Sequence, residues 1–286
     1  MKALILPSWK KATCEELISG NLQKYELYFA KFTDIAFKIY KGEIQITFGN
    51  YDLKDFDFVW LSSMWTTRDV AYGVHLYLKH FNVRHTEVEF ASSKITDQIS
   101  LALDNINTPN TWYKPGLKKK DSFEEIESVC KYPMILKDKI GAQGKNVHLV
   151  ADRRALKKKY RQSSESKRYM IQGFIPNDYE WGLIVANGKI VSVEKKFAAR
   201  GEHRNNVHMG GTEEFLEIIQ TPISIQEIAI KTAKCLGLNW CRVDILENKM
   251  TNELYVLETN RFPGLTIGSS EMNAAREFLK NSISKF

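Results

Sequence analysis

The sequence lacks any apolar run long enough to cross a bilayer. Its first residues, MKALILPSWKKATCEE, are too briefly apolar for a secretion signal and predict a β-strand that leads into a helix. The four cysteines, Cys14, Cys130, Cys235 and Cys241, lack the paired spacing of a metal site and fit free thiols in a reducing cytoplasm. These absences argue against a membrane protein and predict a cytoplasmic one.

The chain has 286 residues, of which 43% are hydrophobic and 26% are charged, as in an ordinary globular protein with a sizeable core. Neither an internal repeat nor a low-complexity linker interrupts it, so we expect its parts to pack around one cleft. A net charge of +7 indicates an anionic partner. We predict an N-terminal α/β part over 1–91, a central part over 92–170 and a β-rich part over 171–286.

Strand-like and helix-like segments alternate along the chain. The runs ALILP, IAFKIY, EIQITF and FVWLS predict strands, with a hairpin turn at Lys41–Gly42. Residues 92–105 predict a helix capped by Ser92 or Ser93. Other helices are predicted over 68–81, 152–161, 224–236 and 271–283, and together the segments predict an α+β fold.

The most informative segment is residues 242–264, RVDILENKMTNELYVLETNRFPG. Its first apolar run carries Asp244, and its second carries Glu258 and Asn260, which face one side because side chains alternate along a strand. A hairpin closing around Lys249–Asn252 brings these side chains together. Two carboxylates and an amide oxygen suit Mg²⁺ held against nucleotide phosphates. The alternative is a surface hairpin, but these acids interrupt otherwise apolar runs.

A lysine beside a glycine-containing loop gives a second candidate site. Lys137 ends the strand-like run PMILK, and the loop GAQGKN follows it with Gly141, Gln143 and Gly144. The ammonium can bind phosphate oxygens, while the glycines let the loop backbone approach closely. A plain turn between strands is the other interpretation of this pattern.

Four segments in this order resemble the ATP-grasp superfamily of ATP-dependent carboxylate–amine ligases. They are the lysine and loop at 133–147, IQGFI at 171–175, RNNVHMGG at 204–211, and the VDIL, VLETN and PG hairpin. The third segment is typical of the branch containing the ribosomal-protein glutamate ligases, the RimK-like enzymes. The resemblance covers residues 90–286. It implies an ATP-grasp fold with an N-terminal α/β domain, a central lid subdomain and a C-terminal β-rich subdomain.

The resemblance also assigns the nucleotide site. Lys94 and Lys137 would contact phosphates, and the metal ligands would hold Mg²⁺, or Mn²⁺ as the alternative ion. The ribose hydroxyls are expected at Asp178 and Glu180, because a carboxylate can accept both hydrogen bonds. Many relatives have Asp-x-Arg here, whereas this chain reads Glu180–Trp181–Gly182. The adenine would lie against a four-residue hinge, made of Gln172, Gly173, Phe174 and Ile175.

Phosphoryl transfer to a carboxylate builds negative charge on oxygens, which cations stabilise without a covalent nucleophile from the protein. The resemblance places Lys196 and Arg204 at the transferred phosphoryl group, with Asn206 on phosphate or carboxylate oxygens. His208 is a candidate base, although a histidine in a polar loop is more often a hydrogen-bonding spacer.

Two basic tracts, KKK at 118–120 and RRALKKKYR at 153–161, stand out in the middle part. Such runs are usually solvated helix faces, with attraction of an acidic peptide as the next interpretation and nucleic acid as the last. The predicted function is amide formation from an amino acid or peptide through an acyl-phosphate. The alternatives are a ligase for a non-peptide metabolite and a regulatory ATP-binding module. A homo-oligomer is compatible with this sequence.

Overall fold

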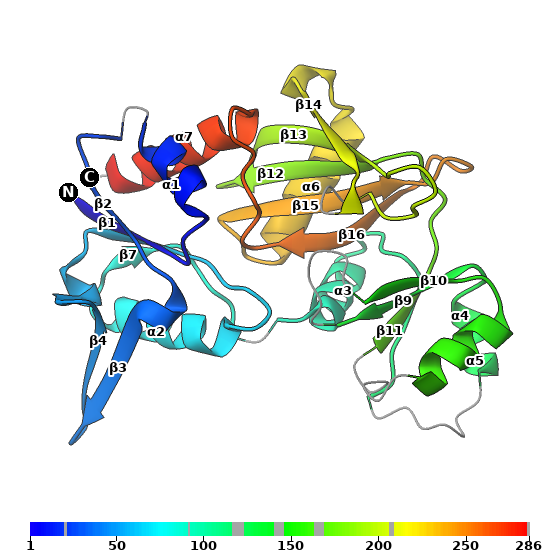
Figure 1. Ribbon diagram of the computed structural model, residues 1–286, viewed down its shortest axis with the longest axis horizontal. Coiled ribbons are helices and arrows are strands. Elements are labelled where there is room, and N and C mark those ends of the chain that lie inside the picture. Colours follow the sequence, from blue (N-terminus) through cyan, green and yellow to red (C-terminus); the bar gives the residue numbers. More distant parts are fainter. Residues whose placement is uncertain are drawn as a thin grey trace.

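The computed structural model describes residues 1–19, 22–90, 92–115, 123–139, 146–162, 169–205 and 209–284. Figure 1 shows an N-terminal part in blue and cyan, a central part in green, and a C-terminal part around a five-stranded sheet. The two chain ends lie side by side on the N-terminal part. Because helices and several separate sheets make up the fold, the predicted α+β class is confirmed. No helix in these ranges is long and apolar enough to cross a membrane.

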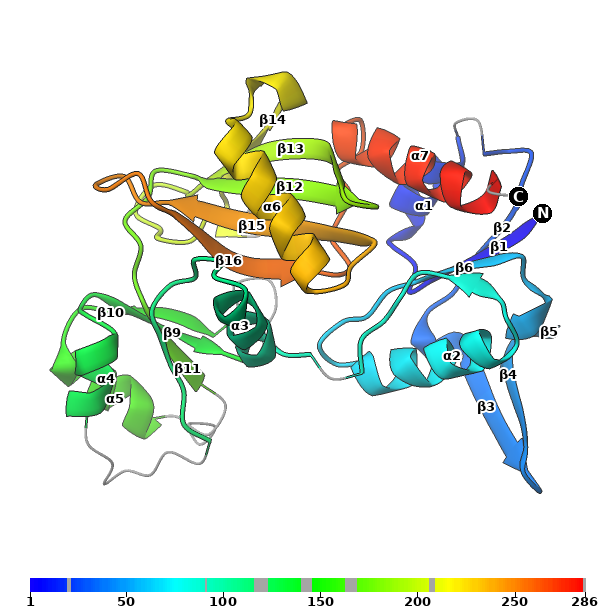
Figure 2. The same cartoon turned by 180° about the vertical axis from the view of Figure 1, so that it is seen from behind.

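The N-terminal part is a parallel four-stranded sheet with helices on both faces (Figures 1 and 2). Its strands in spatial order are β2 (Glu26–Phe29), β1 (Lys2–Leu6), β6 (Phe58–Leu61) and β7 (Arg84–His85). The helices are α1 (Lys11–Ile18), α2 (Arg68–His80) and the C-terminal α7 (Ser270–Ser284). The last segment of the chain therefore completes the first domain.

Side chains that alternate along β1 fill two separate cores. Leu4 and Leu6 pack in a cluster with residues of α2, whereas Ala3 and Ile5 pack in a cluster with residues of α1 and α7. The second cluster also contains Trp240 of the C-terminal sheet. The N-terminal and C-terminal parts thus share one apolar core, which fixes the cleft between them.

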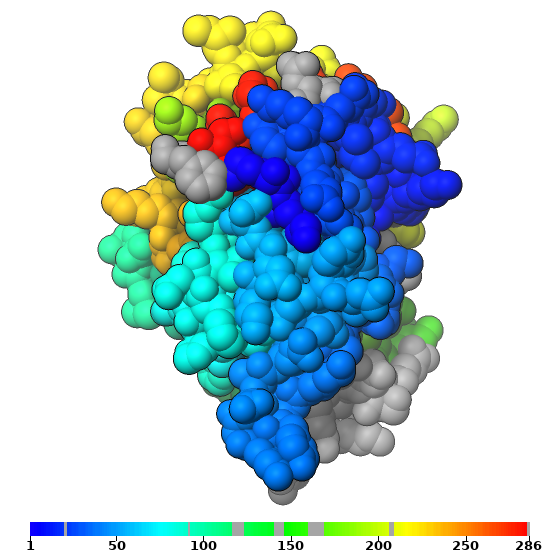
Figure 3. Space-filling model, turned by 90° about the vertical axis from the view of Figure 1, so that its left-hand side faces the viewer, coloured from blue at the N-terminus to red at the C-terminus, as the bar shows by residue number. Residues whose placement is uncertain are grey.

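A hairpin projects from the N-terminal part (Figure 3). It is formed by β3 (Ile35–Tyr40) and β4 (Glu43–Phe48), with β5 (Tyr51–Asp52) as a third strand. The backbone turns at Lys41 and Gly42, which both have positive φ, as predicted.

The described residues of the central part form an antiparallel sheet and three α-helices. The strands in spatial order are β10 (Val147–Val150), β9 (Met134–Asp138), β11 (Tyr169–Gly173) and β8 (Thr111–Trp112). The helices are α3 (Lys94–Leu103), α4 (Glu124–Val129) and α5 (Arg153–Gln162). Ser93 caps α3, since its hydroxyl accepts a hydrogen bond from the N–H of Thr96 at 3.2 Å. Strand β11 crosses the predicted boundary at residue 170.

The C-terminal part is a five-stranded antiparallel sheet with α6 (Ile223–Cys235) on one face (Figure 2). Its strands in spatial order are β14 (Thr212–Leu216), β13 (Lys189–Phe197), β12 (Glu180–Ala186), β15 (Trp240–Glu247) and β16 (Leu254–Asn260). The predicted helices over 224–236 and 271–283 correspond to α6 and α7.

The other face of this sheet changes character along β12. Ile184 and Ala186 belong to the apolar core shared with α7. Glu180, two positions before Gly182 in the sequence, instead forms an ion pair with Lys196. Trp181 points to the α6 side, where it is buried. One sheet face therefore combines an apolar anchor with a charged end, and that end is the candidate site.

Candidate active site

The predicted hairpin of β15 and β16 is confirmed, and its turn includes Asn252 with positive φ. Asp244 pairs directly opposite Glu258, and Arg242 pairs opposite Asn260. The register shifts between Asp244 and Ile245, so the pairing is irregular beside the two carboxylates. The side chains that the sequence predicts to converge therefore lie on neighbouring strands.

Two buried lysines from other elements reach these carboxylates. Lys94 at the start of α3 places its Nζ 3.0 Å from Glu258 Oε2. Lys196 places its Nζ 2.8 Å from Asp244 Oδ1 and also pairs with Glu180. Lys196 lies inside β13. Burial opposes ionisation of Glu258, but Lys94 and Lys137 lower its pKa to about 2.

Lys137 is a third buried lysine, on β9, with 5% of its surface exposed. Burial, followed by the positive charge of Lys94, lowers the pKa of Lys137 to about 8, against the opposing effect of Glu258 and Glu180. Three ammonium groups from α3, β9 and β13 thus surround the hairpin carboxylates. Such a set can bind the oxygens of a phosphate chain.

The charged cluster extends to residues that the sequence interpretation missed. Glu194 Oε1 lies 3.9 Å from Lys196 Nζ and 3.2 Å from Arg242 Nε. Arg242 also pairs with Glu271 of α7 and donates to Gly264 O at 2.9 Å. Burial raises the pKa of Glu194 to about 7, and Arg242 opposes the rise. Polar residues at every second position of β13 are the signal that could have found this cluster.

The departure from Asp-x-Arg at Gly182 has a structural explanation. A Cβ atom at Gly182 would lie 2.5 Å from Glu194 Oε1, which is closer than van der Waals contact allows. The glycine leaves room for the Glu194 carboxylate to lie across the strand. Burial raises the pKa of Glu180, the first residue of this segment, to about 8, with Lys196 opposing.

Helix α3 connects the hairpin to the predicted adenine hinge. Arg261, just after β16, donates to both carboxylate oxygens of Asp97, at 2.6 and 2.9 Å. Gln98 donates to Leu257 O at 3.5 Å and accepts from Gln172 Nε2 at 3.2 Å. The sequence interpretation missed Asp97, Gln98 and Arg261, because their contacts join segments far apart in the chain.

Hinge backbone groups already make hydrogen bonds within the protein. The N–H of Gly173 donates to Asn110 O at 2.9 Å, and the N–H of Phe174 donates to Pro133 O at 3.2 Å. The carbonyl of Ile175 accepts from Asn177 Nδ2 at 2.8 Å. These bonds fix the backbone of the segment.

Other predicted residues lie in different surroundings. Asp178 is largely exposed, with Lys249 Nζ 3.0 Å from its Oδ1, whereas Glu180 is buried in the cluster. Arg204 forms a two-point ion pair with Glu202, at 3.0 and 2.6 Å. The remaining predicted residues, Gly141, Gln143, Gly144, Asn206 and His208, lie outside the described residues, as does the basic tract 118–120.

The donor set fits a magnesium ion. Asn260 Oδ1 accepts from the N–H of Phe262 at 3.1 Å, and Asn260 lies two positions from Glu258 on β16, where alternating side chains share one side. In the ranges given above, no group of three or more His, Cys, Asp or Glu side chains is arranged to hold a metal ion. The protein would therefore supply two carboxylates and an amide oxygen, and phosphates and water would complete the coordination usual for Mg²⁺.

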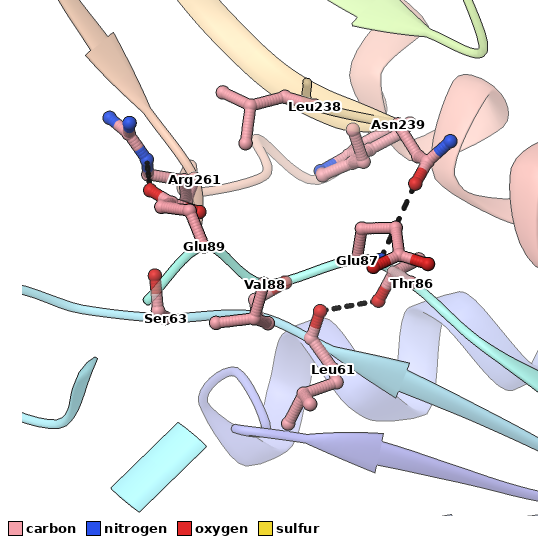
Figure 4. A pocket seen from close by; sticks show the side chains of 11 residues that line it. Leu61, Ser63, Thr86, Glu87, Val88, Glu89, Leu238, Asn239 and Arg261 are labelled. Carbon is pink, nitrogen blue, oxygen red and sulfur yellow. Dashed lines mark hydrogen bonds and ion pairs between the residues drawn. The ribbon is translucent and has the colours of Figure 1, made fainter. Parts of the chain in front are cut away.

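A pocket lies between the N-terminal and C-terminal parts, beside the Arg261 end of the hairpin (Figure 4). Figure 4 shows Arg261 paired with Glu89, and the backbone of Glu87 bonded to Asn239. Its polar wall is made by Ser62, Ser63, Thr86, Glu87, Glu89, Asn239 and Arg261. The pocket is thus next to the charged cluster, and residues of both the N-terminal and the C-terminal part line it.

Comparisons of the sequence with known proteins find one family. A family model described as the RimK-like ATP-grasp domain matches residues 91–281. A probable alpha-L-glutamate ligase of Vibrio atlanticus (strain LGP32) is 31% identical over 169 residues, covering 58% of this chain and 54% of the relative. Another, of Shewanella pealeana (strain ATCC 700345 / ANG-SQ1), is 32% identical over 204 residues, covering 68% and 43%. The chain spans about half the length of these curated relatives.

Solved structures share the fold at low sequence identity. D-alanine–D-alanine ligase from Bacillus anthracis has a TM-score of 0.68 at 17% identity, covering 99% of this chain and 98% of that one. A RimK domain ATP-grasp protein from Sphaerobacter thermophilus DSM 20745 has a TM-score of 0.68 at 15% identity, covering 98% and 100%. The predicted ATP-grasp architecture is therefore confirmed over the whole chain.

Proposed function

Because this chain belongs to the RimK-like ATP-grasp family, we propose that it forms an amide between a carboxylate and an amine, converting ATP to ADP and phosphate. The amine substrate is an amino acid, and glutamate is the first candidate because the curated relatives are named probable alpha-L-glutamate ligases. The observation that carries the proposal is the pairing of Lys94 with Glu258 and of Lys196 with Asp244 at 3.0 and 2.8 Å.

Buried ion pairs cost desolvation energy, and apolar side chains of similar size often fill such positions at no loss of stability. The buried charges at the end of this sheet, on Lys94, Glu180, Lys196 and Asp244, therefore support a functional role. Their arrangement is also specific, since cations and carboxylates alternate over Lys94, Glu258, Lys196 and Asp244. When ATP enters with its metal, both kinds of group gain a new partner of opposite charge.

In the proposed reaction, Lys94 and Lys137 bind phosphate oxygens, and Asp244, Glu258 and Asn260 would hold the metal. Bound Mg²⁺ supplies positive charge that offsets the charge of the phosphates. A carboxylate oxygen of the first substrate bonds to the γ-phosphorus, and the bond from that phosphorus to the bridging oxygen breaks, releasing ADP. The amine nitrogen then bonds to the acyl carbon, the bond from that carbon to the phosphate oxygen breaks, phosphate leaves with its electron pair, and the nitrogen loses a proton.

Arg204 remains the proposed clamp on the transferred phosphoryl group, and Asn206 remains the proposed contact to phosphate or carboxylate oxygens. The ion pair with Glu202 holds the guanidinium in one orientation and raises the pKa of Arg204 above its ordinary value. A charge held in advance stabilises developing negative charge without a reorganisation cost.

The test is to incubate the protein with Mg²⁺, ATP and a panel of amino acids and peptides, with hydroxylamine in place of the amine. The expected products are ADP and a hydroxamate, because hydroxylamine traps an acyl-phosphate. Tight ATP binding with no hydroxamate from any carboxylate would instead support a regulatory module. AMP and pyrophosphate would show adenylation and contradict the acyl-phosphate.

A further inference from the structure

Arg68, the first residue of α2, is a buried cation with spare hydrogen-bonding capacity. Its side chain is 9% exposed, and Glu89 Oε1 lies 3.7 Å from its Nη1, beyond hydrogen-bond length. Within the described part of the chain, Nε and Nη1 of Arg68 have no hydrogen-bond acceptor. The guanidinium lies 3.9 Å from the ring centre of Trp65, which holds one of its faces. Buried donors without acceptors are costly, so a ligand that accepts from them binds favourably.

Two further features of the same segment point to an anion. The Ser63 hydroxyl is 4% exposed and has no hydrogen-bond partner among the described residues. Thr67, which precedes α2, makes no side-chain hydrogen bond to the first turn, since its hydroxyl accepts from the N–H of Met64 at 3.3 Å. An uncapped helix start favours a negative charge, because its amide hydrogens and dipole point towards it.

The nearby carboxylates lie closer to Arg261 than to Arg68, whose ion pair with Glu89 is long. Arg261 binds both oxygens of Asp97 and also pairs with Glu89, so these carboxylates already have a close guanidinium. Burial, followed by the charge of Arg261, lowers the pKa of Arg68 to about 10 although Glu89 and Asp97 oppose the effect. An arginine remains charged at neutral pH, so this position favours an added anion.

The position of Arg68 relates it to the second substrate. Glu89 and Ser63 line the pocket of Figure 4, and Asp97 lies on the same helix as Lys94, the partner of Glu258. The site is thus adjacent to the proposed metal hairpin but built by the N-terminal part. The phosphates of ATP are assigned to the lysines of the other two parts. A planar guanidinium fork matches a carboxylate in geometry.

We propose that Arg68, together with Ser63 and the first turn of α2, binds the unreactive α-carboxylate of the amine-donating amino acid. This inference rests on the proposed function and makes it narrower. The second substrate is then an amino acid with a free carboxylate, and a simple amine or an amino-acid amide is a poor substitute.

The experiment compares acids with amides in binding, so that it does not depend on turnover. Calorimetry with the full chain, Mg²⁺ and a non-hydrolysable ATP analogue measures the affinity of each common L-amino acid and of its α-carboxamide. Dipeptides with free and amidated C-termini form a second arm. At least one acid should bind tenfold or more tightly than its amide. Tighter binding of a free-acid dipeptide than of the free amino acid would assign the site to a peptide C-terminus. That result would overturn the amino-acid assignment.

Variants test the residue itself. Arg68→Met should weaken binding of the acid tenfold or more and leave binding of the amide and of the ATP analogue unchanged. Arg154→Met, which removes an exposed arginine on α5, is the matched control and should change none of these. Equal binding of acid and amide by the unaltered protein, or unchanged acid binding by a folded Arg68→Met variant, overturns the inference. Failure of the proposed function would give a different result from failure of this inference. In that case the acid would still bind through Arg68, but no hydroxamate would form.

Discussion

Two groups of buried cations meet at the cleft, and they differ in how they are paired. Lys94 and Lys196 make ion pairs of 3.0 and 2.8 Å with Glu258 and Asp244. Arg68 is 3.7 Å from its nearest carboxylate and has donors without acceptors in the described chain. The paired lysines fit a ligand that brings both signs of charge, as a nucleotide with its metal does. The arginine, with its long ion pair and its donors without acceptors, fits a ligand group that brings only negative charge.

Lys137 is a third case. It is buried, and it makes no ion pair with a described residue, yet Glu258 and Glu180 act on it from a distance and oppose the lowering of its pKa. It is therefore the lysine whose charge depends most on the arrival of phosphates. Variants of the paired and unpaired groups should accordingly affect different steps.

The largest effect is expected from Glu258→Gln. This change keeps the shape of the side chain but removes the charge that a hard divalent ion prefers and that Lys94 contacts. ADP formation should fall below detection while the circular dichroism spectrum and melting temperature stay close to those of the original protein. Glu253→Gln, on the exposed part of the same hairpin, is the control and should keep full activity. A folded Glu258→Gln variant with ordinary turnover at ordinary Mg²⁺ would refute the metal assignment.

A smaller effect is expected from Lys137→Ala. Loss of a buried ammonium at the phosphates should lower kcat/KM for ATP by about a hundredfold, the scale of losing one charge-stabilising group. Lys158→Ala removes an exposed charge on α5 and should change the same parameter less than about twofold, because exposed charges contribute little. Steady-state kinetics with varied ATP measures both. Equal losses in the two variants would move the phosphate site away from β9.

The smallest effect is a pH dependence set by Lys137. Its pKa of about 8 lies below the ordinary value of 10.5, so it loses its proton in the free protein as the pH rises through 8. ATP affinity should then fall by up to about tenfold per pH unit above 8, because binding must restore the proton. Calorimetry at pH 8.5 in two buffers of different ionisation enthalpy should show proton uptake on ATP binding. The Lys137→Arg variant keeps its charge at this pH, so it should take up fewer protons on ATP binding. Equal proton uptake by the variant and the original protein would assign the proton to another group.

The sequence alone predicts those parts of the site that depend on local patterns. Alternating apolar residues and a polar turn were sufficient to predict the hairpin that sets Asp244 opposite Glu258. The helix containing Lys94 was predicted from its Ser93 cap and its periodicity. Whole-chain architecture followed from the order of these segments, since each one resembles a part of a known fold.

The remaining parts depend on contacts between distant segments. Arg261 binds Asp97 across 164 positions, and Gln172 binds Gln98 across 74, so no local pattern reveals either pair. Arg68 follows WTT in a helix-like stretch, where an arginine is ordinarily solvated. Only its burial and the lack of hydrogen-bond acceptors for its donors distinguish Arg68 from a solvated surface arginine. Gly182 departs from the family pattern, and its reason became visible only when Glu194 was placed beside it.

The most direct test of the nucleotide site is a crystal structure of the protein with Mg²⁺ and a non-hydrolysable ATP analogue. It should show the ion about 2.0–2.1 Å from oxygens of Asp244 and Glu258, with analogue phosphates completing its coordination. The Nζ atoms of Lys94 and Lys137 should lie at hydrogen-bond distance from phosphate oxygens. An analogue ordered at a different place, or an ion bound without Glu258, would contradict the account.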